Sequence, residues 1–262
     1  MFTEVSCAAT AAAELLGVNQ ARISSIEAGR YAVSTERVRA FARGYDCADE
    51  SLIQALCTMT GGRTRGWWDE YRDHLPVALV NLAELEHHAV EVRVCLVIHI
   101  PALLQTTDHA RALFREVAPP LLPYEVEHRL SHRIKRQGVL HGDHALRYTA
   151  LIHEAALRMR FGGGDIARAQ LQHLMDMGER DNITTRVIPF GSGFPGTGQS
   201  IDYLSGHVPQ LDTVQLDTHH GCEFLDAQSQ LTKYRSVLDR METAALTPVA
   251  SRDFIHRLAR QL

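Results

Sequence analysis

Residues 15–29 constrain the fold of this chain most, because they combine a helix stop, a helix cap and an apolar stripe in a short span. Gly17 tolerates the positive φ that ends a helix, and Asn19 is a good N-cap for the next one. Ile23 and Ile26 lie three residues apart on one helix face. The pattern predicts two helices joined by a glycine turn, the helix-turn-helix layout. A plain αα-hairpin in a small bundle has the same periodicity and is the alternative.

The other sides of the second helix carry small and polar residues. They are Gln20, Ala21, Arg22 and Ser25. A helix of about ten residues with this distribution fits the major groove of DNA, where Gln reads an adenine edge and Arg reads a guanine edge or contacts a phosphate.

Two stretches, Val18–Arg30 and Ser34–Arg43, resemble the Cro/repressor-like regulators, also called the xenobiotic-response-element (XRE) family. The resemblance implies six DNA-contacting residues. Those at base-reading positions are Gln20, Ala21 and Ser25. Those near phosphates are Asn19, Arg22 and Arg30.

The rest of the chain resembles the domain of unknown function that follows this DNA-binding domain in many actinobacterial regulators. Five segments carry the resemblance: residues 100–106, 133–137, 153–157, 170–174 and 186–190. The resemblance implies a transcriptional regulator whose second domain dimerises, senses a ligand or docks a small regulatory protein.

The resemblance also exposes two departures near the amino terminus. Family members begin with a helix that packs across the hairpin, whereas only residues 1–5 stand in its place here. We therefore expect the first helix of the DNA-binding domain to be missing. The family tends to place Thr-Gln where this chain has Ala8 and Ala9, which removes a phosphate contact. Two explanations are open: the true start of the protein lies upstream of Met1, or the DNA-binding domain is a degenerate remnant.

The charge of the first 60 residues bears on DNA binding, because affinity comes largely from neutralised phosphates. These residues hold five cations and seven anions, a net charge of −2. From Val18 to Tyr45 the same five cations face only Glu27 and Glu36, a net charge of +3. The favourable charge lies in the segment that would contact DNA, and a two-fold dimer would double it.

The chain has 262 residues, 45% of them hydrophobic, which is enough for two domains with a real core. Its net charge of −4 argues against a generally basic, histone-like protein. No apolar run approaches the roughly 20 residues that span a bilayer, and the amino terminus lacks the basic segment of a signal peptide. Five scattered cysteines without a CxxC pair fit reduced thiols. We therefore expect a cytoplasmic protein without a membrane segment.

We expect three parts: a truncated helix-turn-helix domain over 1–60, a linker with an aromatic cluster over 61–75, and an α+β regulatory domain over 76–262 that binds a ligand or a partner. The linker opens with a polar, glycine-rich segment. An aromatic cluster follows it: Trp67, Trp68 and Tyr71. Exposed aromatic rings are costly, so we expect these to pack between domains or against a partner subunit.

The periodicity predicts an α+β fold, in which an all-α helix-turn-helix bundle precedes a larger domain with a small β-sheet covered by helices. In the bundle we expect further helices over 34–45 and 49–59. In the larger domain we expect helices over 77–88, 125–140, 165–177, 231–246 and 252–262. Strand-like segments are 92–100, the start of 146–161, 184–189, 200–204 and 213–216. The strand order does not follow from the pattern.

Two groups of residues invite a chemical interpretation. His128 and His132 lie four apart on an expected helix and suit a shared metal, but no nearby ligand completes a shell. Cys222 follows His219 and His220, which suits a thiolate with an imidazole base. Adjacent strand residues face opposite sides, however. We therefore expect no metal, no cofactor and no catalytic residue.

Three further segments have structural explanations. Residues 162–164 precede an expected helix, and we expect Asp165 to be its N-cap rather than the amides to bind an anion. Residues 191–198 lack the GxSxG of a nucleophile elbow, and we expect a hairpin loop there. We expect one basic side of the 125–140 helix to be solvated. It carries Arg129, Arg133, Lys135 and Arg136.

We predict a DNA-binding transcriptional regulator rather than an enzyme, and enzymatic activity stays open as an alternative. Its expected partners are double-stranded DNA, a second copy of the chain in a homodimer, and either a small-molecule effector or a small protein. One alternative is a small-molecule-binding protein, or an enzyme of secondary metabolism, that kept a degenerate helix-turn-helix. A polar pocket with perturbed pKa values would favour it. The other is a protein–protein interaction module, which exposed aromatics at 67–71 would favour.

Overall fold

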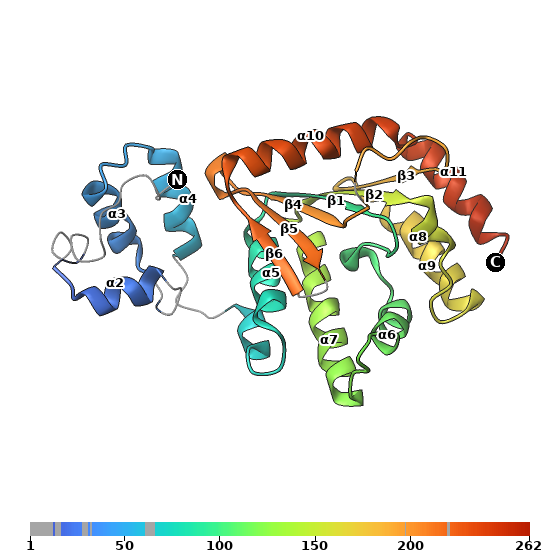
Figure 1. The fold of residues 1–262 in the computed structure, drawn as a ribbon, viewed down its shortest axis with the longest axis horizontal. Helices are drawn as coiled ribbons and strands as arrows, with labels where there is room; N and C mark the ends of the chain where they lie inside the picture. The colour runs from blue at the N-terminus through green and yellow to red at the C-terminus, as the bar shows by residue number, and fades with distance from the viewer. Residues whose placement is uncertain are drawn as a thin grey trace. The chain divides into compact units, whose positions relative to one another are not determined.

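The computed structural model describes residues 13, 17–27, 31, 33–60, 66–196, 198–218 and 221–262. The chain divides into two compact units, residues 1–65 with 207–210 and residues 66–206 with 211–262. The described part of the first unit is helical, and the second combines helices with a six-stranded mixed sheet (Figure 1). The predicted α+β class is confirmed. The helix that we expected to be missing falls on residues outside the described ranges.

The first unit contains α2 (Gln20–Glu27), α3 (Thr35–Gly44) and α4 (Glu50–Thr60). The hydroxyl of Ser34 accepts a hydrogen bond from the amide of Arg37 at 3.4 Å and so caps α3 as predicted. The side chains of α3 and α4 meet in a small cluster that includes Ala42, Ile53 and Cys57. This packing holds the two helices together in a bundle.

The sheet of the second unit has the strand order β3-β2-β1-β4-β5-β6. Its first three strands are parallel, and β4, β5 and β6 add to β1 in antiparallel fashion. The strands are β1 (Glu91–Leu96), β2 (Arg147–His153), β3 (Ile183–Ile188), β4 (Ile201–Ser205), β5 (Thr213–Thr218) and β6 (Gly221–Leu225). The two parallel connections are crossovers that carry helices, as parallel pairs require.

Helices cover both faces of this sheet. The longer ones are α5 (Val77–His88), α6 (Thr107–Arg115), α7 (Pro123–Arg136), α9 (Gly164–Met177), α10 (Gln228–Ala244) and α11 (Pro248–Ala259). Shorter helices are η1 (Trp67–Tyr71), η2 (Ala102–Leu104), η3 (Gln137–Leu140) and α8 (Glu154–Arg158). A further short helix, η4 (Pro209–Leu211), falls on the boundary between the two units. In the part of the chain that the structure describes, no helix has both the length and the apolar character to cross a membrane.

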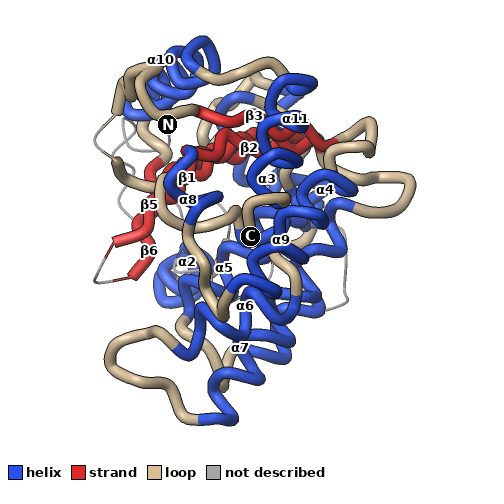
Figure 2. The backbone as a smooth tube through the Cα atoms, turned by 90° about the vertical axis from the view of Figure 1, so that its right-hand side faces the viewer, coloured by secondary structure: helices blue, strands red, loops and turns tan. Residues whose placement is uncertain are grey.

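The alternation of side chains along the strands produces two cores. Cys95 and Leu151 face α10, where they are buried with Leu238. Val94 on β1 faces the other way and is buried with residues of α5, α9 and α11. Figures 1 and 2 show α10 alone along one face and α6, α7 and α9 on the opposite side. The face opposite α10 also carries the polar side chains of the cavity described in the next section.

The aromatic cluster belongs to the second unit. Trp68 and Tyr71 are each 6% exposed and are buried with Leu75, Val80 and Ala83. Their packing is therefore internal to the unit, and the expectation of packing between domains or on a partner subunit is wrong for these two rings. Helix α5 supplies the apolar surface.

The basic side of α7 is not a solvated face. Arg136 is only 3% exposed, Arg133 is half-buried and Lys135 remains exposed. Lys135 pairs with Glu70 at the surface. The expectation fails for Arg136 because its guanidinium forms a buried ion pair with the carboxylate of Glu86 on α5.

Two loop expectations are also wrong. The cap of α9 is Gly163 at φ 97°, and Asp165 lies in the first turn, where its carboxylate pairs with Arg168 at 2.9 Å. The left-handed φ explains why glycine stands there. Residues 191–198 lie between β3 and β4, which are not neighbours in the sheet, so this segment is a crossover and no hairpin loop. Helix α6 and strand β6 have no counterpart among the expected elements.

Candidate functional site

The turn that precedes α2 has the geometry that the glycine predicts. Gly17 adopts φ +61°, the left-handed region that favours glycine. The amide of Val18 donates to the carbonyl of Ala13 at 3.0 Å across the turn. A bond of this span around a left-handed glycine is a Schellman-type helix end. The predicted turn is confirmed.

The start of α2 is capped by Asn19. Its side-chain oxygen accepts a hydrogen bond from the amide of Arg22 at 2.8 Å. One turn further on, Ile23 is fully buried, in a cluster with Ala13, Val18, Phe41 and Tyr45. Ile26 is only half-buried, so Ile23 is the main anchor. This anchor fixes which side of α2 faces outward.

The outward side of α2 is the predicted one. Asn19, Gln20, Ala21 and Arg22 are exposed, and Ser25 is half-buried. Thus α2 and its cap bring together five of the six predicted DNA-contacting residues, while Arg30 lies outside the described residues. The short exposed stretch presents an amide, a guanidinium and small side chains to solvent. This is the donor and acceptor chemistry with which side chains recognise base edges and phosphates.

The arginines of this unit differ in how they are held. Arg39 on α3 donates to Glu50 at 3.0 Å and to Gln54 at 3.1 Å, so its charge is used within the bundle. The guanidinium of Arg22 has no hydrogen bond or ion pair among the described residues. Arg22 is therefore available to a partner from outside the chain.

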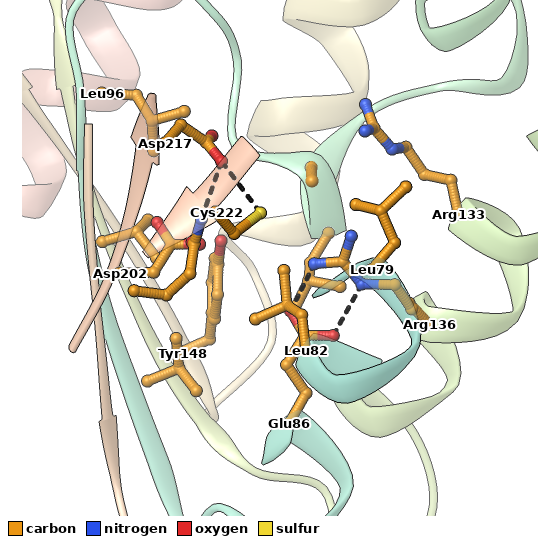
Figure 3. A pocket seen from close by; sticks show the side chains of 15 residues that line it. Leu79, Leu82, Glu86, Leu96, Arg133, Arg136, Tyr148, Asp202, Asp217 and Cys222 are labelled. Carbon is orange, nitrogen blue, oxygen red and sulfur yellow. Dashed lines mark hydrogen bonds and ion pairs between the residues drawn. The ribbon is translucent and has the colours of Figure 1, made fainter. Parts of the chain in front are cut away.

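The second unit holds a cavity of about 70 Å³ beneath the sheet, between α5, α7 and the strands (Figure 3). Its apolar wall comes from α5 and β1, with Leu82 and Val94 among the residues. Its polar lining comes from five elements: Glu86 of α5, Arg133 and Arg136 of α7, Tyr148 of β2, Asp202 of β4, and Gln215 and Asp217 of β5. Cys222 of β6 completes the wall.

A buried ion pair forms one side of the cavity. Arg136 binds Glu86 through two hydrogen bonds, from Nε at 2.7 Å and from Nη2 at 2.5 Å. Both side chains are at most 4% exposed. The two-pronged geometry matches the planar guanidinium to the carboxylate. Its third nitrogen, Nη1, has no hydrogen bond to any described residue.

The opposite side carries Asp202 and Tyr148, which Figure 3 shows facing the ion pair across the cavity. Strand pairing sets Asp202 beside Val94, so its side chain lies on the cavity face of the sheet. Burial raises the pKa of Asp202 to about 8, and the nearby charges of Asp217 and Glu86 add to the effect. Burial also raises the pKa of Tyr148. Neither side chain has a hydrogen-bond partner within the described ranges.

Asp217 marks where the cavity opens, because it lines the cavity and is exposed to solvent. It accepts hydrogen bonds from the Gln215 amide at 2.7 Å and from the Cys222 thiol at 3.6 Å. Burial and the charge of Asp217 raise the pKa of Cys222 to about 11. The thiol is therefore protonated at neutral pH, which disfavours the interpretation of Cys222 as a nucleophile. His219 and His220 lie outside the described residues.

The two histidines of α7 are separated by their packing. His132 is 2% exposed, and its ring lies 5.1 Å from that of Tyr71. Burial lowers the pKa of His132 to about 3. His128 packs instead on His74, at 4.5 Å between ring centroids. Among the described residues no cluster of three or more potential ligands could hold a metal.

The fold and the two sites define a two-part protein, in which a helix-turn-helix unit is joined to an α+β unit with a polar cavity. A model of the helix-turn-helix domain matches residues 8–56. A model of the domain of unknown function DUF5753 matches residues 79–257, more than half of the chain. The chain therefore belongs to the DUF5753 family. Comparison with curated proteins and with solved structures finds no match.

Proposed function

We propose that this protein is a sequence-specific DNA-binding transcriptional regulator of the Cro/repressor-like (XRE) class, as found in actinobacteria, and that it acts in the cytoplasm as a homodimer. The second unit supplies dimerisation or the sensing of an effector. The observation that carries the proposal is the orientation of α2. Ile23 anchors one side, and the exposed side holds Gln20 and Arg22.

The exposure of the residues at the start of α2 supports their roles. Gln20, Ala21 and Ser25 contact base edges, and Asn19 and Arg22 lie near phosphates. The family resemblance adds Arg30 to the residues near phosphates. A helix anchored by a single buried isoleucine has its outer half free to enter a major groove about 12 Å wide. Two copies of α2 in a symmetric dimer would meet successive major grooves, about one helical turn apart.

Replacing Arg22 with alanine is expected to weaken DNA binding and to reduce the slope of log K against log salt by about one unit, because one phosphate contact is lost. The capping bond uses the backbone amide of Arg22, so the helix start is retained. The measurement is fluorescence anisotropy on a labelled duplex over a series of salt concentrations.

Arg147→Ala is the control, since Arg147 is an arginine of the second unit whose side chain is 70% exposed and whose only ion pair among the described residues is a long one, 3.7 Å to Glu91. It removes the same charge from the chain and should leave the slope unchanged. If Arg22→Ala and Arg147→Ala give the wild-type slope alike, the role of Arg22 at a phosphate is refuted.

The polar cavity favours a second candidate function, the binding of a small molecule by the second unit. Perturbed pKa values and a concave site with convergent polar groups are features of ligand sites. Such binding is compatible with a regulator, whose effector would occupy the cavity. The interaction-module alternative loses its main support, because Trp68 and Tyr71 are buried within their own unit.

A further inference from the structure

The cavity of the second unit has one carboxylate in excess. Its lining holds three carboxylates, of Glu86, Asp202 and Asp217, and two guanidinium groups, of Arg133 and Arg136. Glu86 and Arg136 neutralise each other in the buried pair. One guanidinium is left to balance two carboxylates, so the side chains that line the cavity disfavour ionisation of all three acids together.

Asp202 is the carboxylate without an ion-pair partner of its own, although the charge of Arg136, which is bound to Glu86, favours its ionised form. Asp217 is hydrogen-bonded. Burial and the charge of Arg136 lower the pKa of Arg133 to about 9, and the charge of Asp217 offsets part of this effect, so Asp217 and Arg133 lie in each other's field. Arg133 is also held away from Asp202 by Gln105, to which it donates at 2.6 Å, and by the Phe114 ring, 4.6 Å from its Cζ. No hydrogen bond or ion pair to Asp202 exists in the part of the chain that the structure describes. A positive charge from outside would complete the balance.

Two donor groups beside Asp202 also have no hydrogen bond to any described residue, the Tyr148 hydroxyl and Nη1 of Arg136. Both belong to buried side chains that line the cavity, and neither atom is among the buried atoms without a partner, so both are reached from the cavity. A ligand in the cavity can therefore take the place of the water that would otherwise satisfy them. Both groups donate hydrogen bonds, so they call for an acceptor atom in whatever occupies the cavity.

The size of the cavity limits the occupant. Its volume of about 70 Å³ is several times the ~15 Å³ needed by one water molecule and about half of the ~150 Å³ that accepts benzene. An enclosed ligand therefore has about three to five non-hydrogen atoms, and a longer one extends past Asp217 into solvent.

We infer that this cavity binds a small organic cation, with an ammonium group against Asp202 and a hydroxyl or carbonyl oxygen that accepts from Tyr148 and Arg136. The ammonium supplies the missing positive charge, and the oxygen satisfies the unpartnered donors. The site lies in the second unit and needs no DNA. Only the role of the cavity as an effector site rests on the proposed function. Cation binding by the second unit and DNA binding by the first can therefore be refuted independently of each other.

Binding of such a cation depends on pH in a defined direction. Asp202 holds a proton near neutral pH, since its pKa is raised to about 8, and the cation favours its ionised form. Affinity therefore increases as pH rises from 6 to 8. The charged or titratable groups that line the cavity together with Asp202 are Glu86, Arg133, Arg136, Tyr148, Asp217 and Cys222, and the Arg133 head is turned toward Gln105.

Ethanolamine, a cation of four non-hydrogen atoms, is the probe. It is titrated into the full chain and followed by saturation-transfer NMR, with ethylene glycol as the neutral match and glycolate as the anionic match. Ligand-efficiency limits place the dissociation constant at about 0.1–10 mM. We expect ethanolamine to bind at least tenfold more tightly than either match. Equal binding of the three, or no saturable binding of ethanolamine up to about 50 mM, overturns the inference.

The variant test uses Asp202→Asn, which keeps the size of the side chain and removes its charge. We expect the affinity for ethanolamine to fall at least tenfold. We also expect the increase in affinity between pH 6 and pH 8 to be lost. Asp253→Asn removes the same charge from an exposed position of α11 and should bind like the wild type. Unchanged affinity of Asp202→Asn in a folded chain contradicts the assignment.

Discussion

Replacing Glu86 with alanine is expected to lower the free energy of unfolding of the second unit by about 3–5 kcal/mol, the largest loss that we predict for a single substitution. The change leaves Arg136 charged, buried and without its carboxylate partner. Removing one member of a buried pair costs more than the pair contributes, because the remaining charge stays desolvated. Urea denaturation followed by tryptophan fluorescence measures the loss, since Trp67 and Trp68 both lie in this unit.

The surface pair of Glu70 and Lys135 is the matched control. Its side chains are 51% and 44% exposed, and Lys135 lies on the same helix as Arg136. Glu70→Ala should cost less than about 1 kcal/mol. The double variant Glu86→Leu with Arg136→Met should recover most of the stability lost in Glu86→Ala, because no charge is left buried. If Glu86→Ala costs no more than Glu70→Ala, the ion pair does not have the role assigned to it.

Replacing Asp202 with asparagine is expected to stabilise the second unit at pH 8 by about 2–5 kcal/mol and to have little effect at pH 4. The pKa of Asp202 is raised from 3.8 to about 8 in the folded chain. Between these values the folded chain holds a proton that the unfolded chain releases, so wild-type stability falls as pH rises through this window. Each pKa unit corresponds to about 1.4 kcal/mol, and asparagine has no such loss because it does not ionise.

The test compares the free energies of unfolding of wild type and Asp202→Asn in urea at several values between pH 4 and pH 8. The two curves should diverge with increasing pH, and Asp253→Asn should follow the wild-type curve. Parallel curves for wild type and Asp202→Asn would show that Asp202 is ionised in the folded chain. Added ethanolamine should stabilise the wild type at pH 8 and leave Asp202→Asn unaffected, which links this prediction to the cation site.

Helix α2 and the turn before it could be predicted from the sequence because their determinants are local. Gly17 ends one helix, Asn19 caps the next through a residue three positions away, and Ile23 gives the buried side. Each of these effects acts within one or two helical turns, so the residue types alone carry the information. The positions of Gln20 and Arg22 on the exposed side follow directly.

The cavity could not be predicted in the same way. Glu86 and Arg136 lie 50 positions apart, and Asp202 reaches them only because β4 pairs with β1. A basic residue on an amphipathic helix is usually exposed to solvent. The sequence near Arg136 contains no signal that predicts its partner on α5. Strand order depends on such long-range pairing, which periodicity does not encode. Of the polar lining, only Arg133 and Arg136 stood out beforehand, as part of a basic helix side, and Cys222, as a thiol close to two histidines.

The central claim, that the exposed side of α2 recognises a DNA sequence, is tested most directly by selecting bound duplexes from a random pool with the full chain and repeating the selection with Gln20→Ala. We predict that the wild type enriches one motif, made of two related half-sites centred about 10 base pairs apart. Gln20→Ala should bind the pool with lower selectivity at the position that Gln20 contacts. A wild-type chain that is folded, yet enriches no motif over the starting pool, would contradict the account.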